Sequence, residues 1–169
     1  MAHIDLVTDI AAAPEVCFDC SLDVGVHLEA SPGQRIVGGI RSGPMHLGDH
    51  VTWAASHFGI PWRMTSKIVE YQRPSTFTDA MQRGPFGRWR HQHTFEGIDS
   101  GTRMIDHVSF ASPCGTLGQI VDTVVLERYM TQLLRQHNNH LRRVAEGTLH
   151  DATLGEINTR STPRRRARG

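Results

Sequence analysis

Six strand-length segments follow one another between residues 35 and 111, and a long segment of helical periodicity comes after them. Only a few residues, rich in glycine and proline, separate each strand from the next. Connections this short favour sequential antiparallel hairpins. We predict the six strands at Arg35–Ile40, Asp49–His57, Trp62–Tyr71, Thr76–Gln82, Arg88–Glu96 and Thr102–Ala111.

The helical segment has apolar residues at helical spacing from Leu117 to Val144. A capping-box pattern predicts its start at Thr116, and Gly147 predicts its end. A helix of about 30 residues is roughly 45 Å long, so it is expected to lie across most of the sheet.

The N-terminal part adds one strand, at His3–Ile10, because polar and apolar residues alternate there. Pro14 is suited to the first position of a helix that ends near Leu22, and a second short helix is predicted to follow it. The result is an α+β fold, in which a seven-stranded curved antiparallel sheet is wrapped around a long C-terminal helix. One helix does not fill such a sheet everywhere, so we expect an internal cavity.

Charge and composition divide the chain into a domain at 1–150 and a flexible basic tail at 151–169. The net charge is +1, and the tail holds five arginines and two acidic residues. The domain is therefore not predicted to bind nucleic acid specifically. No apolar run approaches the roughly 20 residues of a membrane span. The three cysteines include the pair Cys17 and Cys20 without a second metal-ligand pair, which favours core packing in a reduced, cytoplasmic protein.

The strand at Arg88–Glu96 carries two aromatic rings and two imidazoles on alternate positions. Successive side chains of a strand point to opposite faces, so Trp89, His91, His93 and Phe95 share one face. Imidazoles on an inward face indicate an interior that handles a polar group.

The hairpins on either side bring carboxylates to this face. A turn centred on Pro85 places Asp79 opposite His91. The turn at Gly97–Gly101 places Phe95 opposite Thr102 and His91 opposite Asp106, whereas a slip of two residues would pair His93 with Asp106. The sequence predicts a rung of Asp79, His91 and Asp106, with His93 one step along the strand.

Several local motifs resemble the SRPBCC superfamily, which includes START-like and polyketide cyclase/dehydrase-like proteins. The matches span about residues 3–147 and are Gly48–Trp53 with His57–Gly59, Arg83–Phe86 with His91–Phe95, Gly101 and Thr102 with Asp106, and Pro113–Gly118. The chain is most similar to bacterial single-domain members. The resemblance implies a helix-grip fold with a cavity for a small hydrophobic or aromatic, polyketide-like molecule.

On this basis His91 is the expected proton shuttle, with Asp79 and Asp106 as its orienting carboxylates. If the protein is an enzyme, we expect a cyclase or dehydratase-like lyase or isomerase that uses acid–base chemistry. We expect these residues to bind the ligand: His93, Trp53, His57, Trp62, Met64, Ser66, Phe77, Met81, Trp89, Phe95, Met104 and Phe110. Glu70 is a further inward candidate, and the remaining histidines are expected at the surface or in packing.

Three alternatives stay open. A buried Asp–His–Asp group also occurs as a purely structural network. Two imidazoles on one strand face also fit a metal site, although no metal and no cofactor are assigned. The main functional rival is a non-catalytic carrier of a lipid or small molecule, as a monomer or homodimer.

Overall fold

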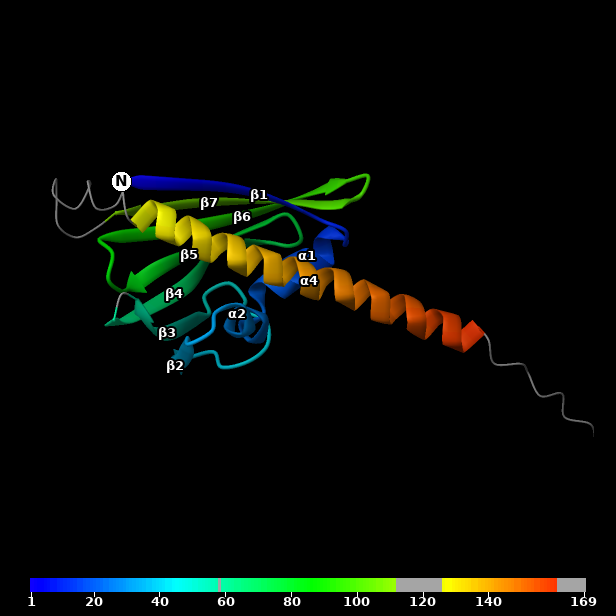
Figure 1. The fold of residues 1–169 in the computed structure, drawn as a ribbon, viewed down its shortest axis with the longest axis horizontal. Helices are drawn as coiled ribbons and strands as arrows, with labels where there is room; N and C mark the ends of the chain where they lie inside the picture. The colour runs from blue at the N-terminus through cyan, green and yellow to red at the C-terminus, as the bar shows by residue number, and fades with distance from the viewer. Residues whose placement is uncertain (58, 112–125, 161–169) are drawn as a thin grey trace, which may run out of the picture.

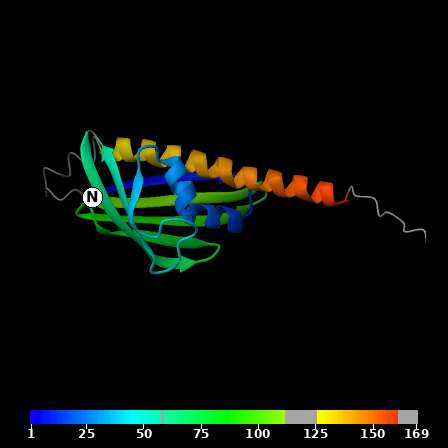
Figure 2. The same ribbon diagram turned by 90° about the horizontal axis from the view of Figure 1, so that it is seen from below.

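The computed structural model describes residues 1–57, 59–111 and 126–160, with side chains through residue 147. Seven strands form one antiparallel sheet in the order β1-β7-β6-β5-β4-β3-β2, and the long helix α4 lies across one of its faces (Figures 1 and 2). This confirms the predicted fold class. The strands are β1 (Ala2–Ile10), β2 (Arg35–Gly39), β3 (His50–His57), β4 (Ile60–Gln72), β5 (Thr76–Arg83), β6 (Arg88–Ile98) and β7 (Gly101–Ala111).

The two short helices follow β1 in the chain and precede β2, as predicted. Helix α1 (Pro14–Leu22) begins at Pro14, whose fixed φ suits the first turn. A backbone N–H at this position would have no acceptor within the helix, so the lack of one in proline costs nothing. Helix α2 (Val24–Ala30) is capped by the Asp23 carboxylate, which accepts hydrogen bonds from the backbone N–H groups of Gly25 and Val26. Both helices contact α4.

Helix α4 (Glu127–Arg160) differs from its prediction at the C-terminal end. It continues through Gly147 to Arg160, and Figure 1 shows this part projecting beyond the sheet. A single glycine costs a helix only about 1 kcal/mol relative to alanine, so Gly147 does not end it. Residues 151–160 of the predicted tail are therefore helical. The predicted start at Thr116, and residues 161–169, lie outside the described residues.

The apolar interior consists of two clusters. The first, called the α1 cluster, surrounds Phe18, whose ring meets the rings of Tyr71, Phe77 and Phe95 edge-on at centroid distances of 5.3–5.5 Å. The second, called the hairpin cluster, lies near the connection between β5 and β6; it includes Phe86, Trp89, Phe110 and Leu134, with Trp62, Met64 and Met81 partly buried against it. Burial of such side chains contributes about 1.5–3 kcal/mol each.

A β-bulge in β4 changes which side chains point inward. The pairing of β4 with β5 shifts register between Ile68 and Glu70, so alternation breaks there. The prediction that Glu70 faces the interior is therefore wrong. Glu70 is exposed and pairs with Arg90 at 2.7 Å, whereas Tyr71 contacts Phe18 in the core.

Candidate functional site

Polar side chains meet inside the molecule on three neighbouring central strands and on α4. Asp79 comes from β5, His91 and His93 from β6, Asp106 from β7 and Asn138 from α4. We call these five residues the polar cluster. His91, His93, Asp106 and Asn138 are buried, with Asp106 fully inaccessible and Asn138 only 2% exposed. The predicted inward faces of β6 and β7 are confirmed, because neither strand is interrupted by a bulge.

The register of the hairpins confirms one predicted pair and corrects the other. Asp79 lies opposite His91, as predicted. Across the next hairpin, however, Asp106 lies opposite His93, and His91 lies opposite Val108. The connection is shorter than predicted because Gly97 and Ile98 still pair with Thr102 and Gly101. Gly101 permits this with a φ of +136°, at a position where any Cβ would collide with the backbone oxygen of Ile10.

Asp106 nevertheless contacts both imidazoles. Its Oδ1 lies 3.0 Å from His91 Nε2 and 2.9 Å from His93 Nδ1. The second oxygen, Oδ2, accepts a hydrogen bond from Asn138 Nδ2 at 2.6 Å, and the same nitrogen lies 3.2 Å from Thr8 Oγ1. A buried carboxylate needs such partners, because an unpaired buried charge is too costly to keep.

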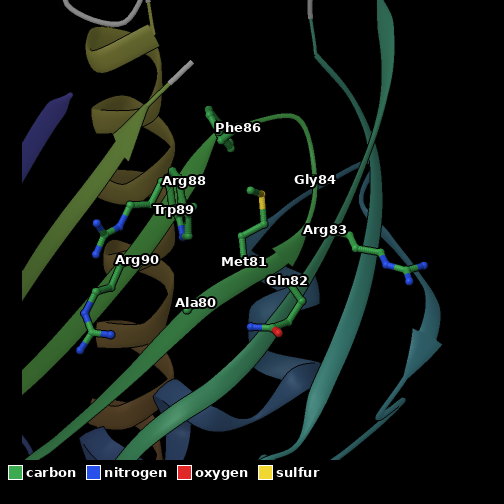
Figure 3. Close-up of a pocket in the computed structure, with 10 residues that line it drawn as sticks. Ala80, Met81, Gln82, Arg83, Gly84, Phe86, Arg88, Trp89 and Arg90 are labelled. Carbon is green, nitrogen blue, oxygen red and sulfur yellow. The ribbon is translucent and has the colours of Figure 1, made fainter. Parts of the chain in front are cut away.

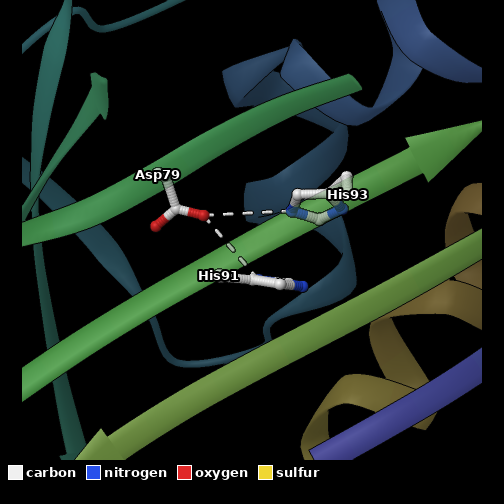
Figure 4. Close-up of side chains that lie close together, drawn as sticks. All are labelled: Asp79, His91 and His93. Carbon is white, nitrogen blue, oxygen red and sulfur yellow. Dashed lines mark ion pairs between the residues drawn. The ribbon is translucent and has the colours of Figure 1, made fainter. Parts of the chain in front are cut away.

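Asp79 lies on the other side of the two imidazoles (Figure 4). Its Oδ2 is 3.7 Å from His91 Nδ1 and 3.9 Å from His93 Nε2, and both contacts are longer than hydrogen bonds. The other oxygen of Asp79 accepts a hydrogen bond from Ser66 Oγ at 2.5 Å. The two imidazoles thus stand between two carboxylates, with ring centroids 3.8 Å apart.

The protonation states follow from this arrangement. Burial alone would lower the pKa of His93, but Asp106 and Asp79 outweigh it and raise that pKa to about 9. Burial would raise the pKa of each carboxyl, but the adjacent imidazoles lower it in both Asp106 and Asp79. Near neutral pH the cluster therefore contains two carboxylates and the imidazolium of His93.

One histidine outside the strand face was misjudged from the sequence. We predicted His27 at the surface, but it is half-buried on α2, with its ring stacked on Trp53 at 4.4 Å and 4.7 Å from the ring of His137. Burial lowers the pKa of His27 to about 4 and that of His137 well below its usual value. Both are neutral near pH 7. The reason for the error is that α2 packs against α4, which its own sequence does not indicate.

Asn138 was missed entirely. Its only sequence signal is its place between Leu134 and Leu141 on the buried stripe of α4, where a polar residue is unexpected. Its contact with Asp106 spans 32 residues and cannot be found from local pattern.

The other predicted ligand-binding residues divide between the two apolar clusters. Trp53, Phe77, Phe95 and Met104 belong to the α1 cluster, and Trp62, Met64, Met81, Trp89 and Phe110 to the hairpin cluster. The polar cluster joins them. The ring of His93 stacks on Phe77 at 4.2 Å, and the ring of His91 lies edge-on to Trp89 at 6.5 Å.

His57 lies apart from the polar cluster. Its Nδ1 is 2.7 Å from the hydroxyl of Tyr129 on α4, and its ring is edge-on to Trp62. His57 and Tyr129 therefore form a second pair of polar side chains, beside the hairpin cluster. Tyr129 of α4 supplies the partner of His57 here, whereas Glu70, the further inward candidate from the sequence, faces outward.

A pocket of about 430 Å³ opens where β5 and β6 separate (Figure 3). Pairing between these strands ends at Ala80 and Arg90, although each strand continues to pair with its other neighbour. Met81, Phe86 and Trp89 give the pocket an apolar wall, and Arg83, Arg88 and Arg90 lie around it. Its size falls within the range of small-molecule sites. Trp89 lines the pocket and also contacts His91 of the polar cluster.

Residues 1–146 match the family model described as polyketide cyclase/dehydrase and lipid transport. The chain belongs to this family. No curated protein matches its sequence significantly. No helix in the described part of the chain is long and apolar enough to cross a membrane.

Solved structures show the same fold at low sequence identity. TTHA0849 from Thermus thermophilus has a TM-score of 0.66 at 14% identity, over 85% of this chain and 99% of that one. The ZhuI aromatase/cyclase from a Streptomyces species has a TM-score of 0.62 at 15% identity, over 85% and 95%. The major latex-like protein 151 from Panax ginseng has a TM-score of 0.62 at 12% identity, over 85% and 97%. These likenesses establish the helix-grip architecture and not a shared activity.

Proposed function

We propose that this protein binds a small, hydrophobic or aromatic, polyketide-like molecule in an internal cavity between the sheet and α4. The observation that carries the proposal is the polar cluster, which lies between two apolar clusters. Trp89, which lines the pocket, also contacts His91 of this cluster. Apolar walls with a few convergent polar groups are typical of small-molecule sites. The ligand's apolar body would contact the aromatic side chains, and its oxygen atoms would face His91 and His93.

The chemistry that these residues can supply is proton transfer. In our proposal His91 accepts a proton from a carbon next to a ligand carbonyl, and Asp106 and Asp79 orient its ring. His93 donates a hydrogen bond to the oxygen that gains negative charge. The same proton then returns to the ligand, either on the new hydroxyl after ring closure or on a hydroxyl that leaves as water. This sequence describes cyclisation or dehydration without a net change in oxidation state.

A non-catalytic carrier is the second candidate. It is favoured by the closeness of the Asp106 contacts, because His91, His93 and Asn138 all converge on one carboxylate as in a structural network. The family description also includes lipid transport. In this case the polar cluster fixes the orientation of a ligand that leaves unchanged. For either candidate we place the protein in the bacterial cytoplasm as a monomer or homodimer; its free cysteines Cys17 and Cys20 fit a reducing compartment.

Binding is tested with 1,3-dihydroxynaphthalene as an aromatic probe and the fluorescence of the three tryptophans as the signal. We expect saturable quenching that weakens about tenfold in Trp89→Leu and His91→Asn. Val7→Ser is the matched control, because Val7 is 62% exposed. Equal affinity in all four proteins would contradict the proposed site.

Native mass spectrometry of the purified full chain separates the two candidates. Any small molecule that co-purifies is identified and then incubated with the wild-type protein and with the Asp106→Asn variant. Conversion by the wild-type protein that falls in the variant supports catalysis. Recovery of the unchanged molecule from both supports the carrier.

A further inference from the structure

The polar cluster presents three metal-ligand atoms to one point. Asp79 Oδ2, His91 Nδ1 and His93 Nε2 all lie within 4.8 Å of one another. They come from adjacent strands, and Figure 4 shows both imidazoles turned toward the carboxylate of Asp79. The carboxylate lies 3.7 Å and 3.9 Å from the two nitrogens.

These separations are too long for hydrogen bonds but close to those of atoms that share a metal ion. A tetrahedral ion with ligand bonds of 2.0–2.1 Å keeps its ligands about 3.3 Å apart. The two nitrogens, which lie within 4.8 Å of each other, would have to approach as well. A closure of about half an ångström would bring Asp79 Oδ2 to the tetrahedral spacing from each of them. Rotation of the Asp79 side chain supplies such a movement, because this side chain is 19% exposed and its other oxygen is bound, among the described residues, by Ser66 alone.

The opposite side of each imidazole is arranged as the outer shell of a metal site. His91 Nε2 and His93 Nδ1 lie 3.0 Å and 2.9 Å from Asp106 Oδ1. Protons on these two nitrogens leave lone pairs on His91 Nδ1 and His93 Nε2, which are the atoms that face Asp79. Metal-bound histidines usually donate their second N–H to a carboxylate, as His91 Nε2 is placed to do. His93 Nδ1 is equally close to Oδ1 but lies outside hydrogen-bond geometry.

We propose that Asp79, His91 and His93 bind a divalent transition-metal ion of the zinc type, with Asp106 and Asn138 as their outer-shell partners. Two imidazoles and one carboxylate are a ligand set that suits Zn²⁺ and the neighbouring ions of the first transition row. Three protein ligands leave a coordination position open for water or a ligand oxygen.

The inference goes beyond the proposed function and does not depend on the organic ligand. The metal ion takes the lone pairs of His91 Nδ1 and His93 Nε2, and any proton on those atoms passes to water. The metal-bound form and the proton-carrying form of the cluster therefore exclude each other. Binding of the aromatic probe without binding of metal would support the proposed function and contradict this inference.

The test is calorimetric titration of ZnCl₂ into the full chain after chelator treatment and dialysis. We expect one equivalent to bind. Asp106→Asn is expected to weaken binding about 10-fold to 100-fold, as the loss of an outer-shell partner does. Loss of a direct ligand in Asp79→Asn or His93→Gln is expected to weaken it further. Circular dichroism checks that each variant folds.

His46→Gln is the matched control, because His46 Nδ1 also lies 3.7 Å from a carboxylate oxygen, that of Asp49, but on the exposed surface. This variant is expected to bind as the wild-type protein does. Co²⁺ gives a readout that needs no variant: paramagnetic shifts should appear on the ring protons of His91 and His93. Failure to bind Zn²⁺, or binding that survives in Asp79→Asn and His93→Gln, would overturn the proposal.

Discussion

Asp106 is the residue on which the polar cluster depends. It is fully buried and has contacts with His91, His93 and Asn138, so three buried groups lose a partner if its carboxylate is removed. An ion pair of this kind need not add to the net stability of the fold. Removing one partner is nevertheless strongly unfavourable, because it leaves the other charge buried.

We therefore predict that Asp106→Ala lowers the free energy of unfolding by about 3–5 kcal/mol. The measurement is urea denaturation followed by circular dichroism. Asp9→Ala is the control, because Asp9 binds Arg103 in an exposed ion pair at 2.9 Å, whose loss should cost less than about 1 kcal/mol. Similar losses of unfolding free energy in the two variants would show that the buried carboxylate contributes no more to stability than the exposed one.

His27 makes the stability of the fold depend on pH. Burial lowers the pKa of His27 to about 4 in the folded protein, below its ordinary value of 6.5. The unfolded chain therefore binds a proton between pH 6.5 and 4 that the folded chain does not, so stability falls as the pH drops through this range. The slope is up to about 1.4 kcal/mol per pH unit for one proton. The adjacent His137 acts in the same direction.

The variant His27→Phe keeps a ring against Trp53 and removes this titration. We predict that its stability falls less steeply than that of the wild-type protein between pH 6.5 and 4, as measured by urea denaturation at several pH values. Parallel curves for the two proteins would contradict the assignment.

Among the elements, the strands without bulges were predicted well and the irregular ones were not. Alternation on β6 placed His91 and His93 inside, and the register of β5 and β6 placed Asp79 opposite His91. The bulge in β4 turns the side chain of Glu70 outward. The short connection before Gly101 places Asp106 opposite His93 and not opposite His91. Bulges and turn lengths depend on backbone geometry, which a period-two pattern does not encode.

Helix α1 is expected to be held mainly by Phe18. This side chain is fully buried, and its ring contacts aromatic residues of β4, β5 and β6. We predict that Phe18→Ala lowers the free energy of unfolding by about 3–5 kcal/mol. The exposed Val7→Ala is the control, with an expected change within about 0.5 kcal/mol. The measurement is again urea denaturation; a loss below about 1 kcal/mol in Phe18→Ala would show that α1 is held by other contacts.

The whole molecule is a scaffold that its family shares, and in our proposal the polar cluster is the part that acts on the ligand. The sequence was enough to predict the sheet, the long helix and the two aspartates that face the imidazoles. It was not enough to predict Asn138 or His27, because their contacts depend on how α4 and α2 pack against other elements. The central claim is that a small aromatic molecule binds between the sheet and α4 and contacts this cluster.

The most direct test follows the imidazole ring signals by NMR while 1,3-dihydroxynaphthalene is added to the full chain. Our account predicts saturable shifts in the signals of His91 and His93. The signals of His46 and His107, which are exposed, should stay in place. Shifts confined to the exposed histidines, or no saturable shift at His91 and His93, would contradict the account.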